Sequence, residues 1–124
     1  MNGKIPHIVQ YQGSKRVLAP QILQYMPERF NRLIEPFSGM AAISIATAYE
    51  NRTNSFLVND LNKPLVDMLQ EAIEKPEQLI MNYSKVWEEQ FSYGENHIQH
   101  FYDVRERFNN GEKTSANMLY LLAR

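Results

Sequence analysis

The chain contains no cysteine, and none of its apolar runs is long enough to form a membrane-spanning helix. A disulfide framework and a thiolate zinc site are therefore excluded. The start Met1–Pro6 lacks the apolar core of a signal peptide, so we expect a cytoplasmic protein without a membrane partner. The net charge is only −1, from 13 basic and 14 acidic residues, so we expect weak binding to nucleic acid by this chain alone.

Glycine is also scarce, with five residues in 124, and a single one falls in the most informative segment. Residues 33–43 read as a short apolar strand, a turn at Gly39 and the start of a helix rich in small residues. A second apolar run ends at Val58, and Asp60 follows it. This order of strand, glycine turn, helix, strand and carboxylate is typical of a nucleoside-binding α/β unit.

The spacing predicts which nucleoside fits. In a doubly wound sheet, a carboxylate after the second strand can accept both ribose hydroxyls. A pyrophosphate requires several glycines in the turn, whereas this turn offers only Gly39, so a cofactor with a small zwitterionic tail such as S-adenosylmethionine fits better. The alternative is an ordinary strand-to-helix turn, in which Asp60 and Asn62 only cap the next helix.

A third segment near the N-terminus, Tyr11-Gln12-Gly13-Ser14-Lys15, makes the pattern more specific. Together with Glu-Pro-Phe-Ser-Gly at residues 35–39 and Asp-Leu-Asn at residues 60–62, it resembles the Dam-type adenine-N6 DNA methyltransferases in motif order and approximate spacing. The resemblance covers the first half of the chain. It implies a site-specific, S-adenosylmethionine-dependent enzyme that methylates DNA, as in restriction–modification systems.

The resemblance also implies a set of cofactor-binding residues. Tyr11 and Lys15 would contact the cofactor from the N-terminal segment, and Asp60 would hold the ribose. Pro36, Phe37 and Gly39 would form the wall and turn beneath the methionine part, and Glu35 completes the set of expected cofactor-binding residues. The alternatives are a solvated lysine at position 15 and a core aromatic at position 11. Met40 stands where the family often has a second small residue.

The family's catalytic Asp-Pro-Pro-Tyr segment does not occur here, because none of the six prolines is adjacent to another. We therefore expect no catalytic residue in this chain and no activity from it alone. Apolar positions of a helix capped by Thr114 or Ser115 are still in phase at Arg124, which predicts a fragment or one half of a split enzyme. Its partner would be a complementary C-terminal half, and unpaired strand edges could also form a homodimer.

Two regions are predicted. Residues 1–62 would form the N-terminal part of the cofactor-binding domain, an α/β, partial Rossmann-like methyltransferase fold. Residues 63–124 would be helical and resemble the start of a target-recognition domain. Their helices begin after Asn62, at Pro76 and near Ile98, the last of these ending around Asn109-Asn110-Gly111.

Side chains of the helical region suggest three specific roles, namely a metal site, a phosphate contact and an aromatic core. His97, His100 and Asp103 share a helix face, yet a metal site lacks a fourth ligand, so surface histidines and no bound metal are expected. Around Arg105 and Arg107, interleaved glutamates favour a solvated mixed-charge face over a phosphate contact. Helical spacing predicts a core role for the aromatic residues Tyr83, Trp87, Phe91, Phe101, Tyr102 and Phe108.

Two other classes of function remain open from the sequence. A non-catalytic cofactor- or nucleotide-binding module would keep the pocket at Gly39 and Asp60 and need no partner. A helical interaction module would bind neither cofactor nor nucleoside.

Overall fold

The computed structural model describes residues 4–124, and the chain divides into two compact units at the boundary between Asn62 and Lys63. Residues 1–3, on which part of the signal-peptide argument depends, lie outside this description. Within the described part of the chain, no helix has both the length and the apolar character needed to cross a bilayer.

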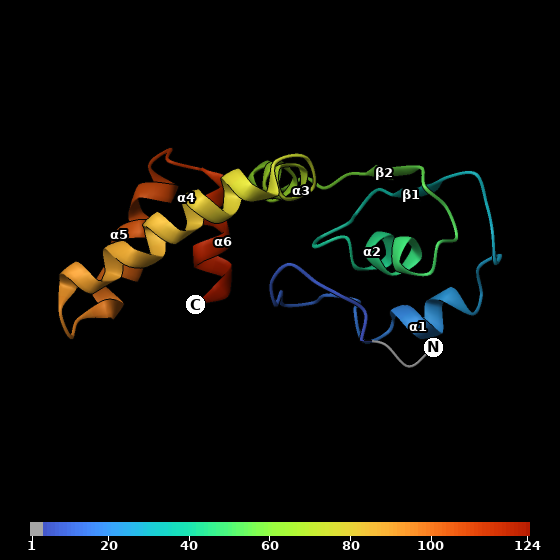
Figure 1. Cartoon of the computed structure of the whole chain (residues 1–124), viewed down its shortest axis with the longest axis horizontal. Helices are drawn as coiled ribbons and strands as arrows, with labels where there is room; N and C mark the ends of the chain where they lie inside the picture. Colours follow the sequence, from blue (N-terminus) through green and yellow to red (C-terminus); the bar gives the residue numbers. More distant parts are fainter. Residues whose placement is uncertain (1–3) are drawn as a thin grey trace. The chain divides into compact units, whose positions relative to one another are not determined.

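The first unit combines two helices with two short strands (Figure 1). Its elements are α1 (Ala19–Leu23), β1 (Leu33–Glu35), α2 (Ala42–Tyr49) and β2 (Phe56–Val58). The strands pair in parallel, and α2 connects them and lies between the sheet and α1. Parallel strands require such a crossover, so this unit has the mixed helix-and-strand character that the sequence predicts.

The core of the first unit is small. Leu33 of β1 is buried, whereas Ile34 and its register partner Leu57 point to the other face and are 60% and 51% exposed. Only one face of the sheet is therefore covered within this unit. The buried cluster between α1 and α2 consists of Ile5, Ala19, Leu23 and Ala46, with Met26, Ile43 and Ile45 packed against it.

Hydrogen bonds and an ion pair of Arg52 add to the stability that this small core provides. The Arg52 side chain, which is mostly buried, donates from Nη1 to the carbonyl oxygens of Leu23 at 2.6 Å, Met26 at 3.2 Å and Pro27 at 3.3 Å. Its Nε bonds Glu50 at 2.6 Å. These carbonyls end α1 and begin the following loop. The Leu23 carbonyl also accepts from the Met26 amide at 3.2 Å, so the guanidinium adds to the hydrogen bonds that end the helix.

The second unit is helical throughout (Figure 1). Its elements are α3 (Lys63–Glu74), α4 (Pro76–Glu89), the 3₁₀ turn η1 (Gln90–Tyr93), α5 (His97–Asn109) and α6 (Ser115–Ala123). The expected starts after Asn62 and at Pro76 are confirmed, as is the end of α5 before Gly111, whose φ is +118°. Thr114 caps α6 by accepting from the Asn117 amide at 3.2 Å.

The core of the second unit forms around α6, which packs against α3, α4 and α5. Tyr120 of α6 is fully buried, together with Leu65 and Met68 of α3 and Val104 of α5. The predicted aromatic core is wrong in part, because Phe91 is 61% and Tyr102 47% exposed. Phe91 lies in η1, beyond the end of α4, so the α-helical spacing that predicted its burial does not apply there, whereas Tyr102 lies on the exposed face of α5.

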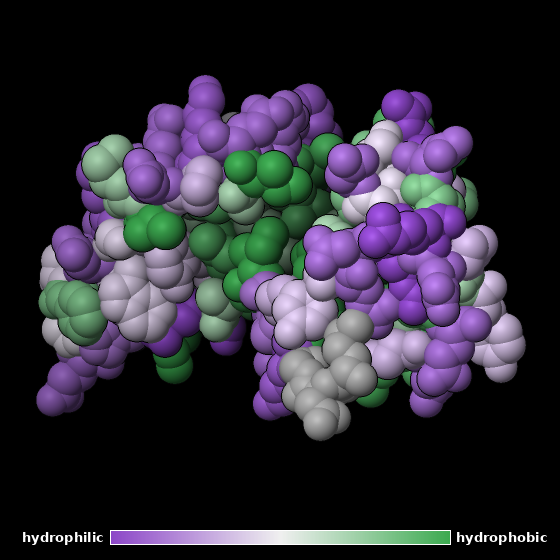
Figure 2. All heavy atoms as spheres, turned by 45° about the vertical axis from the view of Figure 1, so that its right-hand side comes forward, coloured by the Kyte–Doolittle hydropathy of each residue, from purple (hydrophilic) through white to green (hydrophobic). Residues whose placement is uncertain are grey.

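Both units leave large apolar side chains in solvent (Figure 2). Phe37 in the first unit is 91% exposed, and Ile73 and Ile98 in the second are also exposed. Isolated exposed apolar residues are common on protein surfaces, so they do not by themselves mark an interface.

Candidate functional site

The turn between β1 and α2 has an unusual backbone. Gly39 has φ +50° and Ala41 has φ +54°, both in the left-handed region. Glycine adopts this conformation freely, but Ala41 does so at a cost. The Ala41 amide donates to the Ser38 carbonyl at 2.8 Å, so the chain is folded tightly just before α2 begins.

Asp60 contacts this turn directly. Its Oδ2 accepts a hydrogen bond from the Gly39 amide at 2.9 Å, and its Oδ1 accepts one from the Asn62 amide at 2.9 Å. Bonds from the amides of Asn62 and Gly39 lower the pKa of Asp60 from its ordinary value of 3.8, so the group is ionised at neutral pH. The glycine turn and the carboxylate therefore lie together at the carboxyl ends of the two strands.

Tyr11 approaches the same turn from the N-terminal segment. A Cβ added to Gly39 would lie 3.5 Å from Cε1 of the half-buried Tyr11 ring. A side chain at position 39 would thus be both conformationally strained and in contact with the ring. Tyr11, Gly39 and Asp60, which are distant in sequence, are brought together.

Glu35 points to the helix that follows the turn. Its Oε2 accepts from the Ser44 amide at 3.0 Å and from the Ser44 hydroxyl at 2.5 Å. Ser44 is the third residue of α2, and the N-cap residue Ala41 has no side chain that could accept this bond. The Glu35 carboxylate takes over the role of the missing cap from nine residues upstream.

The remaining predicted residues lie at the surface. Lys15 is exposed, and its ammonium donates to the Gly13 carbonyl at 3.2 Å. Pro36 and Phe37 are exposed as well. The Asn59 side chain donates to the Pro36 carbonyl at 3.0 Å and so fixes the backbone that carries the Phe37 ring.

Two residues that sequence reasoning gave no role therefore contribute to the turn, namely Ser44 and Asn59. The Asn59 backbone also bonds the Glu35 carbonyl and the Ser38 amide, each at 2.9 Å, so the parallel pairing continues beyond the strand ends. The sequence carried a signal for Asn59, which lies between Val58 and Asp60. Nothing in the sequence indicated that Ser44 is the partner of Glu35.

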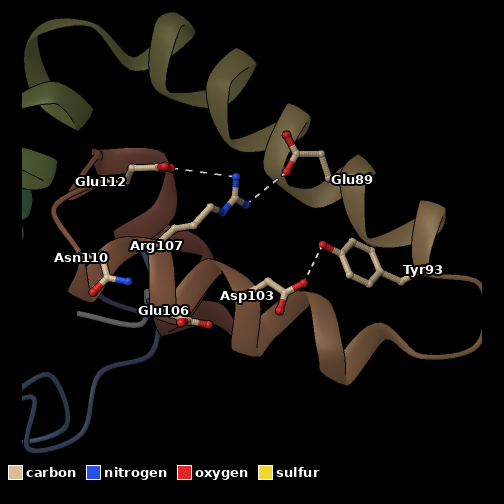
Figure 3. A pocket seen from close by; sticks show the side chains of 7 residues that line it. All are labelled: Glu89, Tyr93, Asp103, Glu106, Arg107, Asn110 and Glu112. Atoms are coloured by element: carbon tan, nitrogen blue, oxygen red, sulfur yellow. Dashed lines mark hydrogen bonds and ion pairs between the residues drawn. The ribbon is translucent and has the colours of Figure 1, made fainter.

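The second unit carries an open pocket of about 590 Å³ between α4, η1 and α5 (Figure 3). Arg107 in its wall pairs with Glu89 at 3.4 Å and Glu112 at 3.9 Å. Four carboxylates surround this single guanidinium, so the pocket does not suit nucleic-acid phosphates. Its lining consists of Glu89, Tyr93, Asp103, Glu106, Arg107, Asn110 and Glu112.

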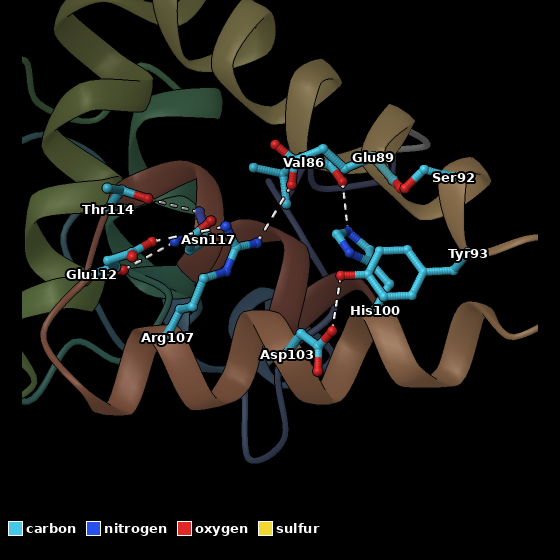
Figure 4. A network of polar contacts seen from close by, with 10 residues as sticks. All are labelled: Val86, Glu89, Ser92, Tyr93, His100, Asp103, Arg107, Glu112, Thr114 and Asn117. Atoms are coloured by element: carbon cyan, nitrogen blue, oxygen red, sulfur yellow. Dashed lines mark hydrogen bonds and ion pairs between the residues drawn. The ribbon is translucent and has the colours of Figure 1, made fainter.

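A hydrogen bond near this pocket links η1 to α5 (Figure 4). The Tyr93 hydroxyl donates to Asp103 at 2.8 Å. Bonds from Gln99 and Tyr93 lower the pKa of Asp103, and the same Tyr93–Asp103 bond raises the pKa of Tyr93. These shifts arise from local pairing on the surface of the helical unit.

The expectation of surface histidines is wrong for His100, which is fully buried (Figure 4). Its Nε2–H donates to the Val86 carbonyl at 2.8 Å, and its ring lies edge-on to Tyr120 with centroids 5.2 Å apart. A carbonyl can only accept, so the proton is on Nε2, while the buried Nδ1 has no partner among residues 4–124. Within those residues, no three His, Asp or Glu side chains are grouped to hold a metal ion.

The comparison with protein families identifies the class to which these features belong. The family model for D12 class N6 adenine-specific DNA methyltransferases matches residues 11–123. The chain therefore belongs to this family. The matched range includes every residue proposed above to contact a cofactor, from Tyr11 to Asp60.

Curated relatives agree with this family. The chain is 28% identical over 123 residues to a type II methyltransferase, M1.LlaDCHI, of Lactococcus lactis subsp. cremoris, a match covering 91% of this chain and 39% of the relative. It is also 28% identical over 102 residues to the retron Ec67 DNA adenine methylase of Escherichia coli, covering 82% and 32% respectively. The chain thus spans 39% and 32% of the length of these two relatives. No solved structure matches it.

Proposed function

We propose that residues 1–62 bind S-adenosylmethionine at the turn formed by Gly39 and Asp60, as part of an enzyme that methylates adenine N6 in DNA. The observation that carries the proposal is the 2.9 Å bond from the Gly39 amide to Asp60. It places a carboxylate beside the glycine turn at the carboxyl ends of parallel strands, where open α/β sheets bind their ligands. We further propose that this two-stranded unit is part of a Rossmann-like methyltransferase fold.

The hydrogen-bonding capacity of Asp60 fits a ribose. A carboxylate offers about four lone-pair positions, and the amides of Gly39 and Asn62 use one on each oxygen. The Leu61 amide also bonds the carboxylate, so at least one position remains for a ribose hydroxyl. Because its pKa is lowered, the group remains a charged acceptor at neutral pH, which strengthens such bonds.

The other predicted residues have compatible positions. Tyr11 and Phe37 offer ring faces that can pack against adenine or a sulfonium cation. The Lys15 ammonium is exposed and can reach a ligand carboxylate by giving up its bond to the Gly13 carbonyl. Pro36 lines the turn through its backbone, and Glu35 acts through Ser44.

The chemistry itself requires residues that these 124 do not include. Methylation of N6 needs a flipped adenine held by hydrogen bonds and stacking, and the sequence has no Asp-Pro-Pro-Tyr segment for this task. We therefore propose that residues 1–124 bind the cofactor but do not methylate DNA without a segment or partner that supplies this motif. Residues 63–124 would contribute to target recognition in that complete enzyme.

Calorimetry with S-adenosylmethionine tests the cofactor site. The unaltered chain should bind, and Asp60→Ala should lower affinity about ten- to hundredfold, because charge-assisted bonds to the diol are lost. Asp67→Ala is the matched control, since Asp67 makes only an exposed ion pair with Lys63. Circular dichroism of each variant would verify that the fold is kept.

Two results would contradict the proposal. Equal affinity of the Asp60→Ala variant and the unaltered chain would remove Asp60 from the site. Methyl transfer to adenine in DNA by the purified 124-residue chain alone would show that the motif is not required.

A further inference from the structure

Two backbone amides at the turn already have acidic partners within the chain. The Gly39 amide donates to Asp60 at 2.9 Å, and the Ser44 amide donates to Glu35 at 3.0 Å. Amides at a glycine turn and in the first turn of the following helix are the donors that bind phosphate in nucleotide-binding folds. In this chain, two of these donors are directed at fixed carboxylates.

Charge acts in the same direction as the hydrogen bonds. The N-terminal end of a helix carries a partial positive charge of about half a unit, which ordinarily attracts anions. The Glu35 carboxylate neutralises this end of α2, and Asp60 adds a second negative charge at the same turn. A phosphate approaching the turn would meet two like charges and lose two donors.

We propose that Glu35 and Asp60 determine the class of ligand at this turn, excluding phosphate-bearing nucleotides and admitting a nucleoside with a cationic or zwitterionic tail. This inference rests on the proposed function for the identity of the ligand. Glu35 is then a positioning and specificity-determining residue that acts through Ser44, and its contact with the cofactor is not required.

Inorganic phosphate is the probe that separates this inference from cofactor binding. Amide chemical shifts of the ¹⁵N-labelled full chain are followed during titration with phosphate, with chloride at equal ionic strength as reference. The unaltered chain should show no phosphate-specific shift at Gly39 or Ser44. Glu35→Gln keeps an acceptor for Ser44 but removes the charge, and should show a phosphate-specific shift of the Ser44 amide that the unaltered chain lacks. Glu35→Ala also frees the amide and should respond more strongly.

Two control variants isolate the cause. Glu28→Gln removes an exposed carboxylate from the same unit and should behave like the unaltered chain. Ser44→Ala removes the hydroxyl bond to Glu35 while leaving both negative charges in place. If the carboxylates exclude phosphate, Ser44→Ala shows no phosphate-specific amide shift, although the turn has lost one hydrogen bond.

The outcomes distinguish the two proposals. Phosphate-specific shifts in the unaltered chain, silence of both Glu35 variants, or an equal response of Ser44→Ala would each overturn the inference. Response of the Glu35 variants alone supports it, whether or not S-adenosylmethionine binds. Failure of S-adenosylmethionine to bind the unaltered chain counts against the proposed function only.

Discussion

The two units of this protein depend on different interactions. Residues 4–62 bury a small cluster of four apolar side chains, and hydrogen bonds from Arg52, Asn59, Glu35 and Asp60 hold the surrounding loops. Residues 63–124 bury larger side chains around α6, including Tyr120 and His100. A unit held by directed polar contacts can define the geometry of a ligand site, whereas a helical unit held by apolar packing tolerates a varied surface.

The largest expected effect tests packing in the helical unit. Tyr120→Ala should reduce the free energy of unfolding by about 3 to 5 kcal/mol, because it empties the centre of the core. Trp87 is the only tryptophan and lies 6.5 Å from Tyr120 between ring centroids, so its fluorescence during urea unfolding reports this loss.

Tyr120→Phe is the matched control. The buried hydroxyl of Tyr120 has no partner among residues 4–124, so its removal should leave stability unchanged or raise it by up to about 1 kcal/mol. A large loss with phenylalanine would show that the hydroxyl, and not the ring, stabilises this unit.

The next largest effect is expected for the polar contacts of Arg52 in the first unit. Arg52→Ala should lower the free energy of unfolding by roughly 2 to 3 kcal/mol, since it removes the hydrogen bonds of Arg52 to three carbonyls and to Glu50. Hydrogen exchange of amides in α1 and α2 should accelerate, while the Trp87 unfolding midpoint remains unchanged. Arg29→Ala, at an exposed position, should alter neither. A shift of the Trp87 midpoint in Arg52→Ala would mean that the two units do not unfold separately.

These contrasts explain what the sequence could predict. Local signals such as Pro76, Thr114 and Gly111 act within a few residues, so the helices of the second unit were predictable. Which side chains are buried depends on neighbours distant in sequence. This is why His100 was expected at the surface but is buried, and Phe91 was expected in the core but is exposed.

In the first unit, the motif order predicted that Gly39 and Asp60 follow adjacent strand ends, and the structure places them in hydrogen-bonding contact. The partners of Glu35 and Pro36 could not be read from the motif. Their bonds to Ser44 and Asn59 depend on how the backbone turns at residues 39–41.

A smaller effect concerns that turn. Ala41→Gly should raise the free energy of unfolding by about 0.5 to 1 kcal/mol, because glycine adopts φ +54° without the steric cost that alanine bears. Urea unfolding, monitored through the amide NMR signals of α2, measures this change in the free energy of unfolding. Ala46→Gly, in the middle of the same helix, should instead be destabilising. A loss of stability in Ala41→Gly would indicate that the alanine side chain makes a compensating contact.

The smallest expected effect is a pH dependence. The folded pKa of Asp60 is lowered by the amides of Asn62 and Gly39, so its stabilising contribution is complete above the ordinary value of 3.8 and is lost as pH falls through the lowered value. The stability difference between the unaltered chain and Asp60→Asn should therefore shrink only below about pH 4. A difference that stays constant from pH 6 to pH 2 would contradict this.

The side chain of Asn59 has a practical consequence for handling the protein. The Pro36 carbonyl receives a hydrogen bond at 3.0 Å from the carboxamide of Asn59. Hydrolysis of that carboxamide during prolonged storage would replace the donor with an anion facing a carbonyl oxygen. An aged sample could thus lose the order of the Phe37 segment while its mass changed by only one dalton, so intact-mass checks belong in every ligand-binding measurement.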